Sequence, residues 1–330
     1  ASDVYKRQRL YKMSIFKLDP AFKDYIWGGT RLRDEYGKKC DYDKVAESWE
    51  LSCHKDGPSV VADGEYKGLT LNEYIEKAGK GVLGKNCERF ENFPILIKLI
   101  DAKDNLSVQV HPDNDYAMRV EGEYGKTEMW YVVDCDEGAT LLYGFKHEIT
   151  KEEFARRIAD NTLLEVTNAV PVKKGDVFFI KSGTLHAIGK GILIAEIQQN
   201  SNTTYRIYDY GRVGKDGKPR ELHVNKALDV TKLAPAEQYP ETPVEKKDGY
   251  DIKLLSKCEY FTTYRVNVET KAELDADENS FNSILVLEGE PVISGGETVS
   301  AKKGESVFIS AGTGKYTVEG KCTFVLTKID

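Results

Sequence analysis

The chain of 330 residues contains no long hydrophobic run, since no 18 consecutive residues are apolar. A membrane-spanning helix needs such a run, so the sequence predicts no membrane partner. The first residues also lack the apolar centre of a secretory signal. Basic clusters are missing too, and 54 acidic residues outnumber 47 basic ones. Nucleic-acid binding requires a basic patch, so we expect none, although a small phosphorylated ligand needs only a few local cations.

Cysteines are few and are spread along the chain without any Cys-x-x-Cys pair. The six are Cys40, Cys53, Cys87, Cys135, Cys258 and Cys322. In a chain of this length the pattern is typical of free thiols in a reducing compartment rather than of a disulfide framework. We therefore expect a cytoplasmic protein.

The first twelve residues read as a non-native leader. The segment Asp3–Gln8 matches what a common sequencing-adaptor end gives when it is translated in frame. We expect the natural start at Met13 and leave residues 1–12 out of the fold prediction. A short basic tail is the alternative, and it changes the functional interpretation little.

Short β-type segments dominate the remaining sequence. Runs rich in Val, Ile, Phe, Tyr and Thr are separated by turns rich in Gly, Asp and Asn. Clear examples are 95–99, 107–111, 129–133, 177–180, 192–198, 260–268 and 323–327. Helical patterns are confined to 70–78, 150–158 and 221–233. Many strands with few helices and no alternating strand–helix order predict a mainly β protein of sandwich or jelly-roll type with a few added helices.

An internal repeat indicates two related β-barrels. Residues 173–186 align without gaps to residues 302–315, and both copies read glycine, acidic turn, apolar strand and a Gly-Thr turn. The first copy ends on His186 and the second on Lys315, and no histidine follows residue 223. We therefore expect a metal-free second barrel. The predicted domains are 13–234 and 251–330, joined by a proline-rich linker at 235–250.

Three short segments carry residues suited to metal chemistry. Gln109 and His111 share one face if their segment is a strand, and Lys126 and Glu128 form a second such pair. His186 lies on a turn after an apolar strand. Two imidazoles, one carboxylate and one amide oxygen can form a compact Zn²⁺ site with room for a water or a substrate oxygen.

The same segments carry a resemblance to a known family. The pattern from Gly175 to His186 resembles the second cupin motif, with Lys181 where that motif usually has proline. The contexts LSVQVHPD and GKTE, in which Gln109 replaces the usual first histidine, are similar to those of the type I phosphomannose isomerases in their short bacterial form. The resemblance covers residues 13–330 and includes the segments 25–29, 46–50, 97–102 and 198–206.

The resemblance implies a fold and a site. It implies two cupin-type jelly-roll barrels, of which 13–234 is catalytic and 251–330 is degenerate. The implied zinc ligands, for one Zn²⁺ per chain, are Gln109, His111, Glu128 and His186. The implied catalytic residues are Arg206, Lys126 and Glu196, and the implied substrate contacts are Ser107, Lys98 and Arg212. Arg206 follows Glu196 by an even offset, which gives a shared strand face only if no turn interrupts the strand.

The resemblance also implies an activity, namely the interconversion of D-mannose 6-phosphate and D-fructose 6-phosphate through a cis-enediol. The proton-transferring group stays open between Glu196, a lysine and a zinc-bound water. One alternative is a sugar-binding cupin sensor without turnover, which the complete metal set disfavours. A second alternative is an Fe²⁺ oxygenase, whose two-histidine, one-carboxylate site fits Gln109 less well. We expect a monomer or a weak homo-oligomer.

Overall fold

The chain folds into two compact units, and each contains segments from distant parts of the sequence. The computed structural model describes residues 14–214 and 216–330, so the expected leader at 1–12 lies outside the described residues. Unit 2 consists of residues 21–49 and 95–241, and unit 1 of the residues before 21, 50–94 and 242–330. The domain boundaries predicted from the sequence stay a prediction. Part of the predicted linker forms the strand β14 (Val244–Lys247).

Unit 2 is built from two antiparallel sheets. The larger sheet has the order β10-β7-β12-β5-β3-β2. Its strands are β10 (Val177–Ile180), β7 (Glu128–Cys135), β12 (Ile192–Gln199), β5 (Ile95–Ala102), β3 (Glu47–Leu51) and β2 (Ala21–Lys23). The smaller sheet has the order β13-β6-β11-β8-β9. Its strands are β13 (Tyr205–Tyr208), β6 (Val108–Val110), β11 (His186–Ala187), β8 (Thr140–Phe145) and β9 (Thr167–Pro171).

The core of unit 2 lies between these sheets. Trp130 and Ile194 of the larger sheet pack in one cluster with Leu141 and Tyr143 of the smaller one. All residues of β5 and β12 are buried, which is why both strands read as near-continuous apolar runs. The few polar residues on these strands are therefore buried with them, and they form the site described below.

Helices cover the rest of unit 2 and one edge of unit 1. The predicted helices appear as α2 (Leu71–Ala78), α4 (Lys151–Ala159) and α5 (Val224–Val230). Thr150 caps α4 by accepting a hydrogen bond from the backbone N–H of Glu153, as its sequence pattern predicts. The helices α1 (Arg31–Asp34) and α3 (Asn114–Val120) were not predicted, and α1, with four residues, is too short to show a helical apolar period.

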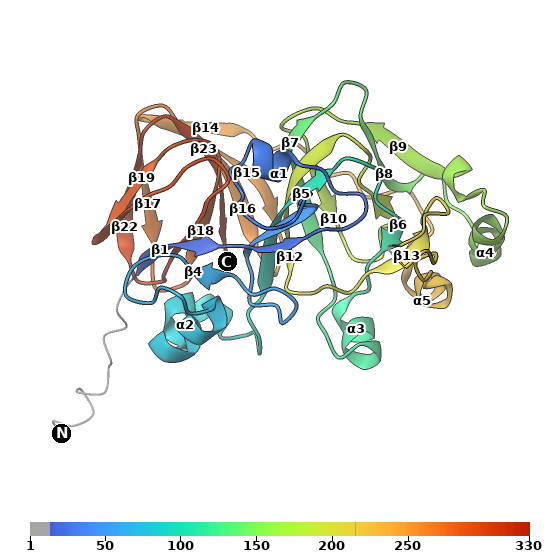
Figure 1. Cartoon of the computed structure of the whole chain (residues 1–330), viewed down its shortest axis with the longest axis horizontal. Coiled ribbons are helices and arrows are strands. Elements are labelled where there is room, and N and C mark those ends of the chain that lie inside the picture. Colours follow the sequence, from blue (N-terminus) through green and yellow to red (C-terminus); the bar gives the residue numbers. More distant parts are fainter. Residues whose placement is uncertain (1–13, 215) are drawn as a thin grey trace. The chain divides into compact units, whose positions relative to one another are not determined.

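Unit 1 also contains two antiparallel sheets, and the first strand of the chain lies beside strands from its end (Figure 1). The larger sheet has the order β14-β15-β16-β23-β18-β21-β1-β4 and the smaller one β17-β22-β19-β20. The larger sheet contains β15 (Tyr250–Lys257), β16 (Thr262–Val268), β23 (Cys322–Lys328), β18 (Asn282–Gly289), β21 (Ser306–Ile309), β1 (Ile15–Asp19) and β4 (Val60–Val61). The smaller sheet contains β17 (Lys271–Ala276), β22 (Gly314–Glu319), β19 (Val292–Gly295) and β20 (Glu297–Ser300).

The two units share one strand order. The run β10-β7-β12-β5 of unit 2 corresponds to β21-β18-β23-β16 of unit 1, and β6-β11-β8-β9 corresponds to β17-β22-β19-β20. Gly183 and Gly312, which occupy the same place in the sequence repeat, both have positive φ values, 86° and 81°, as the tight turn requires. The predicted mainly β fold is confirmed, but none of the four sheets formed by the described residues closes into a barrel.

The strand register differs in one position from the gapless alignment of the sequence repeat. The gapless alignment places Lys315 opposite His186, but Lys315 is exposed and Tyr316 is buried. Because neighbouring residues of a strand point to opposite faces, Tyr316 takes the interior position that His186 occupies in unit 2. The second copy therefore holds one more residue between its glycine turn and the inward-facing side chain.

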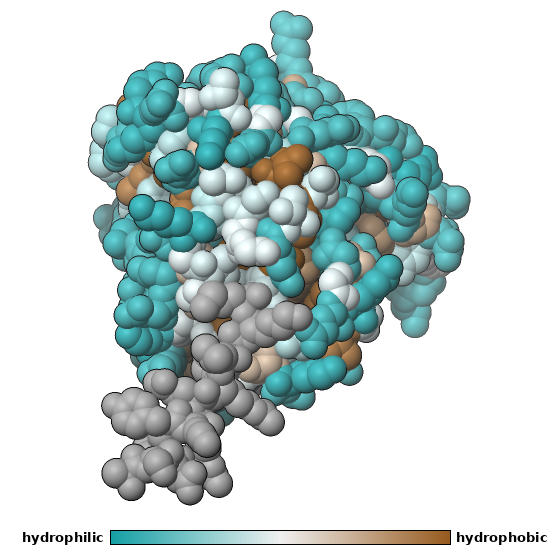
Figure 2. Space-filling view, turned by 90° about the vertical axis from the view of Figure 1, so that its left-hand side faces the viewer, coloured by the Kyte–Doolittle hydropathy of each residue, from teal (hydrophilic) through white to brown (hydrophobic). Residues whose placement is uncertain are grey.

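The surface is mainly hydrophilic. The face in Figure 2 shows apolar residues only in small separate areas, as is normal for a protein surface. No helix among residues 14–214 and 216–330 has the length and apolar character that crossing a bilayer requires. All six cysteines are free, and Cys53, Cys87 and Cys322 are buried.

Candidate active site

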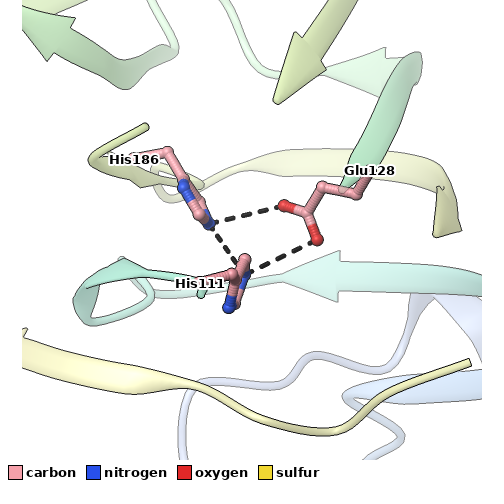
Figure 3. A group of neighbouring side chains, drawn as sticks. All are labelled: His111, Glu128 and His186. Atoms are coloured by element: carbon pink, nitrogen blue, oxygen red, sulfur yellow. Dashed lines mark hydrogen bonds and ion pairs between the residues drawn. The ribbon is translucent and has the colours of Figure 1, made fainter. Parts of the chain in front are cut away.

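Three buried side chains of unit 2 converge from separate strands (Figure 3). His111 follows β6, Glu128 begins β7 and His186 begins β11. The Nε2 atom of His111 lies 3.6 Å from Oε2 of Glu128, and Nε2 of His186 lies 3.4 Å from Oε1. The two Nε2 atoms are 3.1 Å apart. The smaller sheet thus supplies both imidazoles and the larger sheet supplies the carboxylate.

The imidazoles are oriented as metal ligands. His111 Nδ1 lies 3.0 Å from the carbonyl oxygen of Thr203, and His186 Nδ1 lies 2.8 Å from that of Thr184. A carbonyl can only accept, so each Nδ1 carries the proton and each Nε2 presents a lone pair to the other. Burial lowers the pKa of His186 to about 4 and that of His111 well below its usual value, which favours neutral rings.

A divalent cation fits this donor set. Two facing lone pairs repel one another unless a positive ion lies between them. Oε1 of Glu128 has no hydrogen-bond donor and Oε2 has only the Lys126 ammonium, although the side chain is completely buried. A buried carboxylate without donors is costly, and a metal ion removes that cost. The observed orphan atoms therefore match a Zn²⁺ site made of neutral imidazoles and one carboxylate.

Gln109 lies beside this triad. In the smaller sheet it pairs directly with His186 on one side and with Arg206 on the other. Directly opposed residues of antiparallel strands point to the same face, so the three side chains share the interior face of the sheet. The structure thus brings Gln109 next to the triad, and its role as a fourth ligand stays a prediction.

A chain of buried ion pairs continues from the triad across the larger sheet. Lys126 Nζ lies 2.6 Å from Glu128 Oε2 and 3.6 Å from Glu196 Oε1. Lys98 Nζ lies 3.3 Å from the same oxygen of Glu196 and 3.5 Å from Oε2 of Glu47. All five side chains are nearly inaccessible to solvent. Three carboxylates face two ammonium groups, so one negative charge is left for a cation to balance.

The two central carboxylates have opposite pKa shifts. Burial and the nearby charge of Glu196 raise the pKa of Glu128. Burial also opposes ionisation of Glu196, but the ammonium groups of Lys126 and Lys98 outweigh it and hold the pKa of Glu196 below its usual value. Glu196 is therefore the carboxylate that stays ionised without further help, and Glu128 is the one that most needs a cation.

The residues that pair with Glu128 and with one another, Lys126, Glu196, Lys98 and Glu47, line a cavity of about 250 Å³, whereas the triad itself is not part of its lining. Six of the predicted site residues line it, namely Ser107, Gln109, Lys98, Lys126, Glu196 and Arg206. The walls also include Trp27, together with Glu47 and Arg220, to which no functional role is assigned from the sequence. The cavity has a wall with four cationic side chains, one of which, Lys126, contacts Glu128 of the triad, and its size suits a small polar molecule.

Arg206 reaches the cavity from the smaller sheet. Its Nη1 donates a hydrogen bond of 2.9 Å to the carbonyl oxygen of Glu221, while its buried Nε has no acceptor. Glu196 and Arg206 do not share a strand face, because β12 ends at Gln199 and the chain passes into the other sheet. The two residues instead line the same cavity from the two sheets.

Arg212 is placed differently from the other predicted contacts. It does not line the cavity; its guanidinium donates to Oδ1 of Asp209 at 3.2 Å and to the carbonyl oxygen of Asn105. Asp209 also accepts a 2.8 Å hydrogen bond from Nε of Arg220, which does line the cavity. Asp209 therefore orients two arginines, of which only Arg220 faces the space for a ligand.

Comparison with known proteins decides the family. Residues 15–138 match the type I phosphomannose isomerase catalytic domain, and residues 251–329 match the mannose-6-phosphate isomerase cupin domain. The mannose-6-phosphate isomerase ManA of Bacillus subtilis is 39% identical over 312 residues, which cover 94% of this chain and 97% of that protein. The chain belongs to the type I mannose-6-phosphate isomerase family.

Solved structures of mannose-6-phosphate isomerases share the fold. A crystal structure of the enzyme from Bacillus subtilis superposes with a TM-score of 0.89 at 38% identity and covers 95% of this chain and 99% of its own. A structure described as the holo, zinc-bound mannose 6-phosphate isomerase superposes with a TM-score of 0.77 at 17% identity and covers 96% and 100%. The second likeness shows the fold alone.

Membership of the mannose-6-phosphate isomerase family confirms the predicted isomerase activity, and nothing in the comparisons supports the sensor. Two lining residues, Glu47 and Arg220, were missed. Glu47 lies in a segment that carried the resemblance, but only the ion pair with Lys98 gives it a role. Arg220 lies 14 residues beyond Arg206 in a loop, where no strand period points to the cavity.

Proposed function

We propose that this chain interconverts D-mannose 6-phosphate and D-fructose 6-phosphate in the cavity of unit 2. The observation that carries the proposal is the buried triad of His111, Glu128 and His186 beside a cationic cavity wall. An aldose–ketose shift moves a proton between two neighbouring carbons and passes through an enediol, whose developing negative charge needs stabilisation. The metal site and a row of cations supply that stabilisation.

His111, Glu128, His186 and Gln109 would hold one Zn²⁺ per chain. When bound, the ion supplies Lewis acidity toward the carbonyl oxygen of the open-chain sugar. The protein's part is to keep both imidazoles neutral, to fix them through their Nδ1–H groups and to hold the Glu128 carboxylate in a water-poor interior. The choice of zinc rests on the donor set of two neutral imidazoles and one carboxylate.

We assign proton transfer to two residues of the buried ion pairs, Glu196 and Lys126. Glu196 lines the cavity, and its buried Oε1 lies 3.3 Å from the Lys98 ammonium and 3.6 Å from that of Lys126. An ionised oxygen in that position can accept a proton from a bound sugar, and Nζ of Lys126 can return one. Arg206, with its unpaired Nε, adds positive charge where the enediolate develops.

The phosphate end is assigned to Arg220 together with Ser107, both of which line the cavity. Arg220→Ala is expected to raise KM about tenfold or more with little change in kcat. One lost charge-assisted hydrogen bond costs about 1.5–3 kcal/mol. Steady-state kinetics with mannose 6-phosphate measure the effect, and mannose without phosphate should react equally poorly with both proteins.

Arg212→Ala is the matched control, because Arg212 shares Asp209 with Arg220 but does not line the cavity. Its KM is expected to rise less than that of Arg220→Ala. Asp209→Asn removes the charge of the carboxylate that holds Arg220, so it should raise KM as Arg220→Ala does. A larger effect from Arg212 would return the phosphate contact to the residue predicted from the sequence.

The overall proposal is tested by assaying the purified chain in a coupled isomerase assay before and after metal removal. We expect about one zinc per chain, loss of activity with a chelator, and recovery on adding Zn²⁺. An active protein that contains no metal would contradict the proposal. The measurement also separates the isomerase from a sensor, which would bind sugar phosphate without turnover.

The proposal also includes the two jelly rolls, the cellular compartment and the oligomeric state. The shared strand order of the units supports two cupin-type jelly rolls, one catalytic and one degenerate. Six free cysteines, three of them buried, suit the reducing cytoplasm. The monomeric or weakly associated state expected from the sequence stays a prediction, as does the absence of a nucleic-acid partner.

A further inference from the structure

Unit 1 contains a second cavity of about 330 Å³, separate from the catalytic residues. It is lined from β14, β15, β16, β17, β18 and β23, all of which belong to unit 1. Nothing in the mechanism above uses it. Its position can be compared with that of the active site, because the two units share one strand order.

The strand register shows that this cavity occupies the place of the active site. Glu128 pairs with Ile180, and Asn282 pairs with Ile309, the same position of the repeat. Asn282 is therefore the counterpart of Glu128. Its Nδ2 lies 2.9 Å from the hydroxyl of Tyr316, just as Glu128 contacts His186 in unit 2.

The ion-pair positions can be matched in the same way. In unit 2, Trp130 pairs with Glu196, which pairs with Lys98. In unit 1, Ile284 pairs with Leu326, which pairs with Tyr264. Leu326 thus occupies the position in unit 1 that corresponds to Glu196 in unit 2, and Tyr264 occupies the position that corresponds to Lys98.

The pairing of the smaller sheets completes the comparison. Leu274 pairs with Tyr316 as Gln109 pairs with His186, so Leu274 stands for Gln109. Leu274, Asn282, Tyr264 and Leu326 all line the second cavity. The chain has therefore kept the space of the active site while replacing its metal ligands and charges with neutral side chains.

The chemistry of the second cavity suits a neutral, hydroxylated ring. Tyr250 and Tyr264 offer aromatic surface, and Leu274 and Leu326 add an apolar floor. Two carboxylates, Glu245 and Asp275, and two ammonium groups, Lys247 and Lys328, complete the lining, so its net charge is zero. Neither a metal ion nor a phosphate is favoured by such a set, whereas carboxylates and ammonium groups together can bond sugar hydroxyls.

Asn282 gives the cavity a polar group. Its side chain is 2% exposed, and its Nδ2 donates to the Tyr316 hydroxyl and to the carbonyl oxygen of Asp275. The residue lines the cavity, where its Oδ1 atom can accept a hydrogen bond from a donor such as a hydroxyl.

We propose that the cavity of unit 1 is a second binding site, for a neutral pyranose sugar. The apolar face of the ring packs on Tyr250 and Tyr264, one hydroxyl donates to Oδ1 of Asn282, and the remaining hydroxyls contact the charged side chains of the lining. The proposal does not depend on the catalytic assignment, because every residue involved belongs to unit 1.

The test is methyl NMR of the full chain, titrated with methyl α-D-mannopyranoside, whose locked ring and missing phosphate make it unfit for isomerisation. Ile252 and Leu274 report on the second cavity, and Ile100 and Ile188 report on the catalytic one. We expect saturable shifts at Ile252 and Leu274. Shifts only at Ile100 and Ile188, or shifts that do not saturate, would overturn the proposal.

Two neighbouring substitutions provide the matched comparison. Leu254 lines the cavity, and Lys253, its neighbour in the regular part of β15, points to the opposite face and does not line it. Leu254→Trp fills the cavity and should weaken binding by at least about tenfold. Lys253→Trp should bind as the unchanged protein does, and both variants should keep their isomerase activity. Equal binding by the two variants would place the sugar elsewhere.

Discussion

His186→Ala is expected to lose its zinc and more than about 100-fold in kcat, with the fold largely retained. Loss of an outer-sphere partner alone costs 10–100-fold in metal affinity or activity, and His186 is an inner ligand in the proposed site. Its ring also shields the Glu128 carboxylate, which would be left with Lys126 as its main partner. Metal analysis and kcat are measured on the same preparation.

Two controls separate metal loss from unfolding. Lys315→Ala changes the residue that the sequence repeat aligns with His186, but Lys315 is exposed in unit 1, so metal content and kinetics should not change. Circular dichroism and a melting curve show whether His186→Ala still folds. If that variant stayed folded and fully active without metal, the metal assignment would be wrong.

Arg206→Ala is expected to lower kcat by about 10²-fold or more and to change KM less. Removing one preorganised donor to a developing oxyanion typically costs 10²–10³ in kcat. The unpaired Nε of Arg206 is available for that role, because its Nη1 is already held by the carbonyl oxygen of Glu221. An interaction that forms fully only in the transition state affects kcat more than KM.

Arg206→Lys separates the contribution of the planar guanidinium geometry from that of its positive charge. Lysine keeps the positive charge but cannot hold the Glu221 carbonyl and a substrate oxygen at once in the planar geometry of a guanidinium. We expect only partial recovery of kcat. An effect confined to KM in both variants would make Arg206 a binding residue and leave charge stabilisation to the metal and Lys126.

The mainly β fold was predictable because the relevant signals are local. β5 and β12 are mostly apolar and fully buried, and Thr150 marks the start of α4 with its own side chain. The sequence could not show that 50–94 joins unit 1 with 242–330, because that grouping depends on contacts between distant segments. A gapless alignment also could not predict that Lys315 faces outward. One extra residue in the turn reverses which side chains of the following strand face inward.

The metal triad was predictable for a similar reason. Spacing within a strand and a glycine turn define His111, Glu128 and His186 almost residue by residue. The residues proposed to contact the phosphate were harder to predict, because Arg212 and Arg220 both follow β13 in an irregular segment without a repeating period. Both guanidinium groups donate to Asp209, and only the folded structure shows that Arg220, not Arg212, lines the cavity.

The pairing of β1 with β21 has a consequence for biosynthesis. Ile15 pairs with Ile309, so β1 has no neighbour on that side until residues 306–309 of β21 have been synthesised. Unit 2 ends at residue 241 and can be completed earlier. The catalytic half is therefore expected to fold while the nascent chain is still growing, and β1 keeps an unpaired edge until β21 emerges.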